Sequence, residues 1–287
     1  MNEFQIITDS TCDFPNELYE TLKLTVVPLT VLYQGKERDD TNDDSLHDLY
    51  QGLRNGESAS TSAINPQRWA NAMEAALKEN KDVLVMAVSS GLSTTYQSAV
   101  IAAQELQEKY PHRKIYVADT LAASLGEGLL VWYACKKREE GMDIDGVYRW
   151  VEENKLHLCH WFTVDDLMHL KRGGRINAAT ALVGTMLQIK PVLHVDDEGR
   201  LVNKVKCRGR KASIEALAEK MCASGTGYDN RFAAISHGDC LEDAQYLAQL
   251  IKERCGVEEV LISYVGAVVG SHAGPGTVAL FFLGDKR

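Results

Sequence analysis

The chain has 287 residues, of which 45% are hydrophobic and 25% charged, a balance typical of a globular protein long enough for two domains. Its formal net charge of -9, without a long run of Lys and Arg, argues against nucleic-acid binding. Seven scattered cysteines without a Cys-x-x-Cys pair predict neither a disulfide framework nor a zinc cage, and favour reduced, mostly buried thiols.

The N-terminal half alternates β-rich runs with helical patterns. Its first residues lack the basic and apolar regions of a secretory signal, so we expect a cytoplasmic protein. The patterns predict strands at residues 5–8, 25–32, 83–88 and 115–118, and helices at 66–79, about 96–106, 124–137 and 144–154. Such alternation favours a parallel sheet covered by helices.

The pattern changes beyond residue 155. Residues 192–195 and 201–205 flank Asp-Asp-Glu-Gly, which predicts a hairpin, and helices at 213–222 and 241–254 alternate with strands at 232–236 and 260–264. The sequence therefore predicts an α/β protein of two domains. We expect residues 1–155 to form a parallel sheet flanked by helices and residues 156–287 to form a smaller α+β domain.

The segment from Val260 to Leu283 contains no Asp, Glu, Lys or Arg and is long enough to cross a bilayer. The glycine-rich run from Gly270 to Gly276 would break a membrane helix. We therefore expect two buried strands joined by a glycine-rich loop, and no transmembrane segment.

Two hydroxyl-rich segments precede predicted helices. Residues 89–95, Ser-Ser-Gly-Leu-Ser-Thr-Thr, join a buried strand to a helix, and Ser60-Thr61-Ser62 comes just before a helix that starts at Asn65-Pro66. Free N–H groups at a helix start favour a negative ligand, although such hydroxyls more often only cap the helix. In a doubly wound sheet, both segments would reach one crevice at the carboxyl edge.

Two further segments carry groups that bind anions. His272 lies in the glycine-rich run and can donate to a carboxylate, although a single histidine is more often structural. Arg172 and Arg175 flank two glycines after an apolar patch, where an arginine can pair with an acid. The alternative is a helix C-cap with surface arginines.

Other chemistries have weaker support. Ser93 and His272 would be the nucleophile and base of a hydrolase, but Ser93 lacks the Gly-x-Ser-x-Gly elbow. A metal site is suggested by His157, Cys159, His160, Asp165 and Asp166. We do not expect one, because successive residues of the run 156–164 face opposite ways if it is a strand. The chain also lacks the usual phosphate-loop and dinucleotide-binding motifs, so no cofactor is predicted.

Several motifs, in this order, resemble the DegV family of bacterial lipid-binding proteins over nearly the whole chain. They are Thr-Asp-Ser-Thr-Cys-Asp at 8–13, Thr-Ser-Ala-Ile-Asn-Pro at 61–66, Ser-Ser-Gly-Leu-Ser-Thr-Thr-Tyr-Gln-Ser-Ala at 89–99, Arg-Gly-Gly-Arg-Ile at 172–176, Lys-Pro at 190–191, His-Gly-Asp at 237–239 and His-Ala-Gly-Pro-Gly-Thr at 272–277. The resemblance implies a two-domain fold that encloses a long-chain fatty acid.

The resemblance also implies which residues bind. Thr61, Ser93 and His272 match the positions that hold the fatty-acid carboxylate. The remaining candidate ligand-binding residues are Ser62, Gly91, Thr94, Arg172, Arg175 and Gly274. The chain departs from the usual family pattern at Thr94, where a glycine is usual, and at Ala273, where a threonine is usual, so the headgroup geometry can differ.

Some members of the family serve as the non-catalytic carrier subunit of a two-component fatty acid kinase. Such a carrier presents the carboxylate to a separate ATP-dependent kinase subunit and takes the acyl phosphate to phospholipid synthesis. Arg208 and Arg210, with Lys211, match a basic stretch of the family that would contact this partner, although they can equally be a solvated surface. The alternatives are a lipid or small-acid hydrolase and a lipid-responsive regulatory protein.

Overall fold

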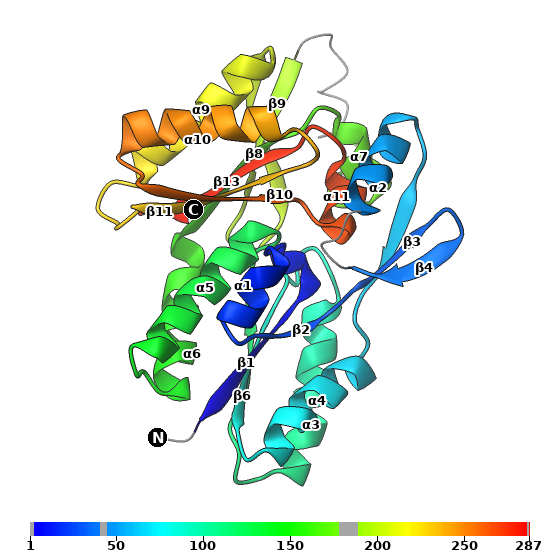
Figure 1. Ribbon diagram of the computed structural model, residues 1–287, viewed down its shortest axis with the longest axis vertical. Helices are drawn as coiled ribbons and strands as arrows, with labels where there is room; N and C mark the ends of the chain where they lie inside the picture. The colour runs from blue at the N-terminus through cyan, green and yellow to red at the C-terminus, as the bar shows by residue number, and fades with distance from the viewer. Residues whose placement is uncertain (1–2, 41–44, 178–188, 286) are drawn as a thin grey trace.

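A computed structural model of the protein describes residues 3–40, 45–177, 189–285 and 287 (Figure 1). The first half contains β1 (Phe4–Asp9), a 3-10 turn (Ser10–Cys12), α1 (Asn16–Thr21), β2 (Thr25–Val27), β3 (Thr30–Tyr33), β4 (Lys36–Asp39), α2 (Ser45–Arg54), β5 (Ala59–Ser62), α3 (Pro66–Lys78), β6 (Asp82–Ala87), α4 (Thr95–Lys109), β7 (Ile115–Asp119), α5 (Leu125–Glu139) and α6 (Ile144–Asn154). The second half contains a 3-10 turn (Lys155–His157), β8 (Leu158–Thr163), α7 (Leu167–Arg172), β9 (Ile189–Val195), β10 (Leu201–Arg208), α9 (Arg210–Ser224), β11 (Phe232–His237), α10 (Leu241–Cys255), β12 (Glu259–Tyr264), α11 (Ala267–Ala273) and β13 (Val278–Leu283).

The first half is built on a parallel four-stranded sheet in the order β2-β1-β6-β7. Every residue of β6 is buried, as expected for an inner strand covered on both faces. Helices α3 and α4 pack on one face of this sheet, and α5 and α6 lie on the other (Figure 1). Helix α3 begins where Asn65 accepts a hydrogen bond from the Arg68 N–H, so the predicted cap is present.

The second half is built on a six-stranded sheet in the order β10-β9-β8-β13-β11-β12. All its neighbouring strands are antiparallel except β11 and β12. Helices α9 and α10 cover the outer face, and α5 packs on the face that looks toward the first sheet (Figure 1). The predicted fold class, a parallel sheet flanked by helices followed by an α+β half, is confirmed. We propose that the domain boundary lies near residue 155, between α6 and β8.

A third, smaller sheet corrects two local predictions. Residues 25–32 are not one strand, because β2 pairs with β1 whereas β3 pairs with β4 and β5. Pro28 lies between them and has no N–H to continue a ladder, so the chain changes sheets there. Residues 60–62 belong to the strand β5 rather than to a loop, so their side chains alternate between two faces.

The segment from Val260 to Leu283 also differs from the prediction. Two strands are present, but the short helix α11 separates them, and Ser271 and His272 belong to this helix instead of to a glycine-rich loop. The helix stops at Gly274, whose φ of +83° is unfavourable for other residues. In the part of the chain that the structure describes, no helix is long and apolar enough to cross a membrane.

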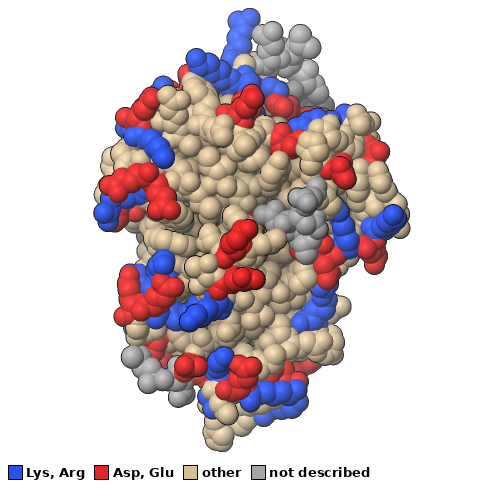
Figure 2. Space-filling model, viewed as in Figure 1, with Lys and Arg blue, Asp and Glu red and all other residues tan. Residues whose placement is uncertain are grey.

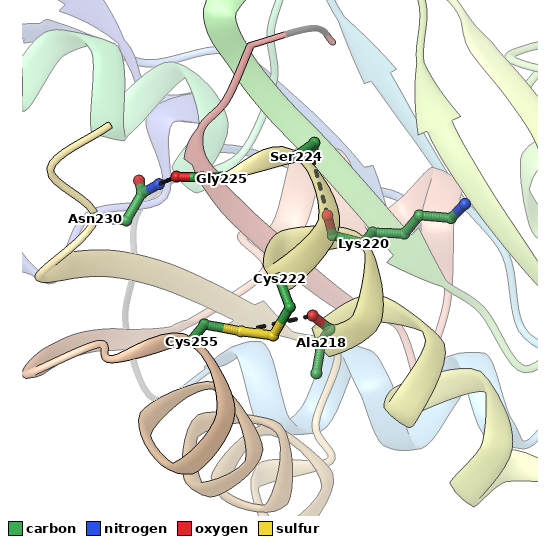
Figure 3. Close-up of a disulfide and its surroundings, with 7 residues drawn as sticks. All are labelled: Ala218, Lys220, Cys222, Ser224, Gly225, Asn230 and Cys255. Carbon is green, nitrogen blue, oxygen red and sulfur yellow. Dashed lines mark hydrogen bonds between the residues drawn. A yellow bond between two sulfur atoms is a disulfide. The ribbon is translucent and has the colours of Figure 1, made fainter. Parts of the chain in front are cut away.

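The expectation that all cysteines are reduced is wrong for one pair. Cys222, near the end of α9, and Cys255, at the end of α10, form a disulfide with a Cα–Cα distance of 5.2 Å (Figure 3). The two cysteines are 33 residues apart, and only the packing of α9 on α10 brings them together. Spacing along the chain therefore gave no sign of the pair. The other five cysteines take no part in a disulfide.

Candidate functional site

A cavity of about 510 Å³ lies between the carboxyl edge of the parallel sheet and the inner face of the six-stranded sheet. Its volume is within the range of small-molecule sites. The segments that follow β1, β6 and β7 contribute Thr11, Ser93 and Ser124, respectively. The cavity thus lies at the carboxyl edge where parallel sheets usually bind ligands.

The wall formed by the six-stranded sheet is mainly apolar. Phe162 of β8 is paired with Ala279 of β13, and His160 is paired with Phe281, so these four side chains share one face of the sheet. All four line the cavity, together with Val195 from β9. This wall offers a mainly apolar surface that also contains the His160 imidazole and the hydroxyl of Ser236 from β11.

Thr61 and His272 meet at one end of the cavity. Thr61 Oγ1 lies 2.8 Å from His272 Nε2, although the residues are 211 positions apart in the chain. Strand β5 carries Thr61 and packs against α11, which carries His272. Burial, with a smaller contribution from the charge of Arg175, lowers the pKa of His272 to about 4. The imidazole is therefore neutral near pH 7, with one N–H to donate.

Arg175 brings a positive charge to the same end. Its side chain is partly buried, and its Nε donates to the Leu92 carbonyl at 3.2 Å. The guanidinium also donates to the Gly173 carbonyl. A side chain at Gly173 would collide with His272, because a Cβ there would lie 2.1 Å from His272 Nδ1. The glycine lets the segment after α7 approach α11 closely.

Ser93 lies one residue before Thr94, the N-cap residue of α4, and lines the cavity. Its Oγ accepts a hydrogen bond from the Thr95 N–H at 3.2 Å and lies 2.9 Å from Thr95 Oγ1. These contacts satisfy a free donor at the start of α4, as the capping alternative proposes. The neighbouring Thr94 is exposed but also borders the cavity. Both residues are therefore within reach of a ligand at this end.

The remaining predicted ligand residues do not line this cavity. Ser62 is exposed, on the face of β5 opposite to Thr61. Gly91 borders another cavity, and Gly274 packs against His169. Arg172 is exposed, donates to His169 Nδ1 at 3.1 Å and borders a second cavity of about 410 Å³.

The second cavity shares its inner wall with the first. Thr61, Arg175 and His272 border both, so these three side chains separate an apolar space from a more polar one. A group held by these residues would be reachable from the polar side.

The two predicted partner-binding arginines differ in their surroundings. Arg208, at the end of β10, is exposed. Arg210 is partly buried, and its guanidinium contacts the Asp243 carboxylate at 2.8 Å. On the face shown in Figure 2, basic and acidic side chains are intermingled.

Sequence reasoning missed a buried cluster of four carboxyl groups under the cavity, formed by Asp9, Asp13, Asp40 and Glu127. Burial raises the pKa of Asp9 and of Asp40 to about 6, and raises the pKa of Asp13 and Glu127 well above the usual range. Two cavity hydroxyls are bound to this cluster, since Thr11 donates to Glu127 and Ser124 donates to Asp13. Only the Thr-Asp-Ser-Thr-Cys-Asp motif signalled it.

The geometry gives no support to the hydrolase alternative. In the described part of the chain, Ser93 and His272 hydrogen-bond to Thr95 and Thr61, and not to each other. A serine nucleophile needs its base within hydrogen-bond reach. The described residues also contain no cluster of three or more His, Cys, Asp or Glu side chains able to hold a metal ion.

Fold and site together define an α/β protein that encloses an apolar cavity ending in hydroxyl, imidazole and guanidinium groups. The chain belongs to the DegV family, whose model, described as an uncharacterised protein, matches residues 3–285. A DegV domain-containing protein of Clostridium perfringens is 45% identical to this chain, over an alignment that covers 100% of this chain and 99% of the relative. Another DegV domain-containing protein, from Lactococcus lactis, is 38% identical over 99% of this chain and 98% of the relative.

Solved structures agree with this assignment. A DegV family protein from Thermus thermophilus, described for its fatty acid binding, has a TM-score of 0.89 and 35% identity over 99% of this chain and 100% of its own. DegV from Bacillus subtilis, described as a fatty acid binding protein, has a TM-score of 0.84 and 27% identity. The match covers 99% of this chain and 100% of the Bacillus subtilis chain.

Proposed function

We propose that the protein binds one long-chain fatty acid in the cavity of about 510 Å³. The carboxylate would lie at the end formed by Thr61, Ser93, Arg175 and His272, and the acyl chain along the apolar wall. The observation that carries the proposal is that one cavity is lined both by these four polar side chains and by the apolar wall of the six-stranded sheet. The fatty-acid binding described for relatives from Thermus thermophilus and Bacillus subtilis supports it.

The energetics are consistent with tight binding. Burying about fifteen methylenes at roughly 0.8 kcal/mol each gives on the order of 12 kcal/mol before association and ordering are subtracted. The carboxylate loses its water, so donors must replace it. Two hydroxyls, a neutral imidazole and a guanidinium supply these donors at one end of the cavity.

We further propose that the protein is a non-catalytic carrier that presents the carboxylate to a separate ATP-dependent kinase subunit and takes the acyl phosphate to phospholipid synthesis. Arg172 and His169 support this, because their polar cavity adjoins the proposed carboxylate end. The chain itself lacks a recognisable nucleotide-binding motif. Arg208 and Arg210 would contact the partner, and we expect the protein in the cytoplasm because the proposed kinase subunit needs ATP.

The first experiment is denaturing organic extraction of freshly purified protein, followed by mass spectrometry. Near-stoichiometric fatty acid is the expected result. Protein that carries no lipid and fails to bind added fatty acids would contradict the binding proposal. The carrier role is tested separately by mixing lipid-loaded protein, ATP and the kinase subunit and trapping acyl phosphate with hydroxylamine. A kinase that works equally well on free fatty acid would contradict it.

A further inference from the structure

The six-stranded sheet ends at β12, and one edge of this strand is unpaired. Strand β12 (Glu259–Tyr264) pairs in parallel with β11 on one side, and no strand pairs with its other side in the part of the chain that the structure describes. Helix α10 covers the outer face of this end of the sheet (Figure 1). A free sheet edge presents a row of N–H and C=O groups that can pair with another strand.

Three residues of β12 direct their backbone groups toward the open edge. The Val265 N–H, just after β12, donates to the His237 carbonyl of β11 at 2.8 Å, so Val265 faces β11. Backbone groups of alternate residues point the same way along a strand, so those of Val260, Ile262 and Tyr264 point away from β11. Among the residues that the structure describes, these three N–H groups donate to none outside the sheet.

Other edge strands of the protein carry features that discourage pairing. Every residue of β4 (Lys36–Asp39), at the edge of the third sheet, is charged. Strand β10, at the opposite edge of the six-stranded sheet, has a bulge and three exposed cationic side chains, those of Lys204, Lys206 and Arg208. Charges and bulges protect edge strands from association. The register of β12 with β11 is uninterrupted, and its only charged residue is Glu259 at its start, so β12 lacks both protections.

The start of β12 is acidic. Glu258 and Glu259 are both exposed. The nearby Arg231 forms an ion pair with Asp229 at 2.7 Å, so these two charges offset each other. The rest of the strand carries no charge. An excess of negative charge therefore lies at one end of an uncharged strand.

The end of β12 lies beside basic side chains of α2. The Tyr264 hydroxyl lies 3.5 Å from the Asp239 carboxylate, which also contacts Arg54 and His47. Two basic side chains thus share one carboxylate, and the His47 side chain is 61% exposed. An antiparallel strand of the same sequence would bring its acidic start to this basic end.

We propose that β12 pairs with β12 of a second copy of this chain, antiparallel and about a two-fold axis at Ile262. In an antiparallel ladder, residues whose backbone groups face the partner strand must lie opposite each other. Ile262 is the middle one of the three, so this axis places Ile262 opposite its own copy and Val260 opposite Tyr264. Two-fold dimers are the commonest symmetric assemblies. The dimer goes beyond the proposed fatty-acid binding and does not depend on it.

This register also suits the side chains. Val260 opposite Tyr264 is a pair of a β-branched and an aromatic residue, which stabilises antiparallel sheets. Glu259 lies opposite the uncharged Val265, so no like charges meet directly across the two strands. The acidic start of each strand faces the end beside α2 of the other copy. These matched ends favour a second copy over an unrelated extended peptide.

The test measures the oligomeric state of the whole chain by analytical sedimentation over a concentration series around the micromolar range. The 31.8 kDa chain is expected to form a species of twice that mass as the concentration rises. Ile262→Lys places two like charges opposite each other at the axis and should raise the Kd of the dimer by about tenfold or more. Ile262→Glu should do the same. An equimolar mixture of these two variants should dimerise again, because Lys then faces Glu.

Val205→Lys is the matched control. Val205 lies in β10, at the other edge of the same sheet, and like Ile262 it is partly buried against the core under α9 and α10. The variant adds the same charge to the same sheet and should leave the dimer unchanged. Neither residue lines the proposed fatty-acid cavity, so both variants should bind fatty acid like the wild type.

A wild-type chain that stays monomeric throughout the series would overturn the inference. So would an unchanged dimer in Ile262→Lys, an equal loss in Val205→Lys, or a mixture of the Lys and Glu variants that stays monomeric. If the Ile262 variants do not fold, amide hydrogen exchange in the wild type decides. The N–H groups of Val260, Ile262 and Tyr264 should exchange more slowly as the concentration rises, and exchange rates independent of concentration would contradict the pairing.

Discussion

The contact between Thr61 and His272 allows a sharp test of the carboxylate site. Thr61→Val replaces a hydroxyl with a methyl of similar size in the strand β5, where a β-branched residue remains favourable. The change removes one donor to the carboxylate and the 2.8 Å partner of His272 Nε2. A hydrogen bond to a charged group contributes about 1.5–3 kcal/mol, so the Kd for fatty acid should rise about 10- to 150-fold.

The assay is competition against a fluorescent fatty acid, with chemical denaturation of each variant to confirm folding. Ser62→Ala is the matched control, since Ser62 is the next residue of β5 but is exposed and borders none of the cavities described. It should bind like the wild type. Unchanged affinity in Thr61→Val, or equal losses in both variants, would refute the location of the carboxylate.

Three further predictions concern binding and stability. Ser93→Ala should weaken fatty-acid binding. It should also lower the free energy of unfolding by about 1 kcal/mol, because Ser93 Oγ accepts from the Thr95 N–H at the start of α4. A loss of stability with unchanged affinity would mean that Ser93 stabilises the helix start and does not bind the ligand. Burial raises the pKa of Asp40 to about 6, so the protonated carboxyl stabilises the fold. This stabilisation is fully present below about pH 4 and is lost as the pH rises through about 6. The unfolding free energy of Asp40→Asn relative to wild type should therefore increase by roughly 3 kcal/mol between these values, and a difference independent of pH would contradict the raised pKa. Reduction of Cys222–Cys255 should cost about 3–4 kcal/mol for its 33-residue separation, measured as a lower midpoint of denaturation with reductant, whereas Cys222→Ser should not respond to reductant.

Local signals were sufficient for much of the fold. The uninterrupted apolar run of β6 and the Asn65-Pro66 start of α3 each have a physical cause within a few residues, and both elements occur where predicted. Elements whose form depends on distant partners were less predictable. The break at Pro28 assigns two strands to two sheets, and α11 is helical although its sequence is rich in small residues.

The site shows the same distinction. Ser93, Arg175 and His272 could be singled out from the sequence, because each lies in a short segment with a recognisable chemical pattern: hydroxyls before a helix, arginines beside glycines, and a histidine in a glycine-rich run. The residues around the acyl chain could not, because Val, Leu and Phe in a cavity wall have the same composition as in a packed core. His160 falls between these cases. It was considered only as a metal ligand, since its lack of a polar neighbour becomes visible only when β8, β13 and α5 are packed together.

This difference bears on how selectivity arises in the cavity. A carboxylate needs several donors in fixed positions, so the polar end is constrained by directional contacts such as the one between Thr61 and His272. Apolar contacts have no direction, and a wall made only of them would accept many chains of similar volume. Chain selection therefore requires either a change in cavity shape or a polar group placed along the wall.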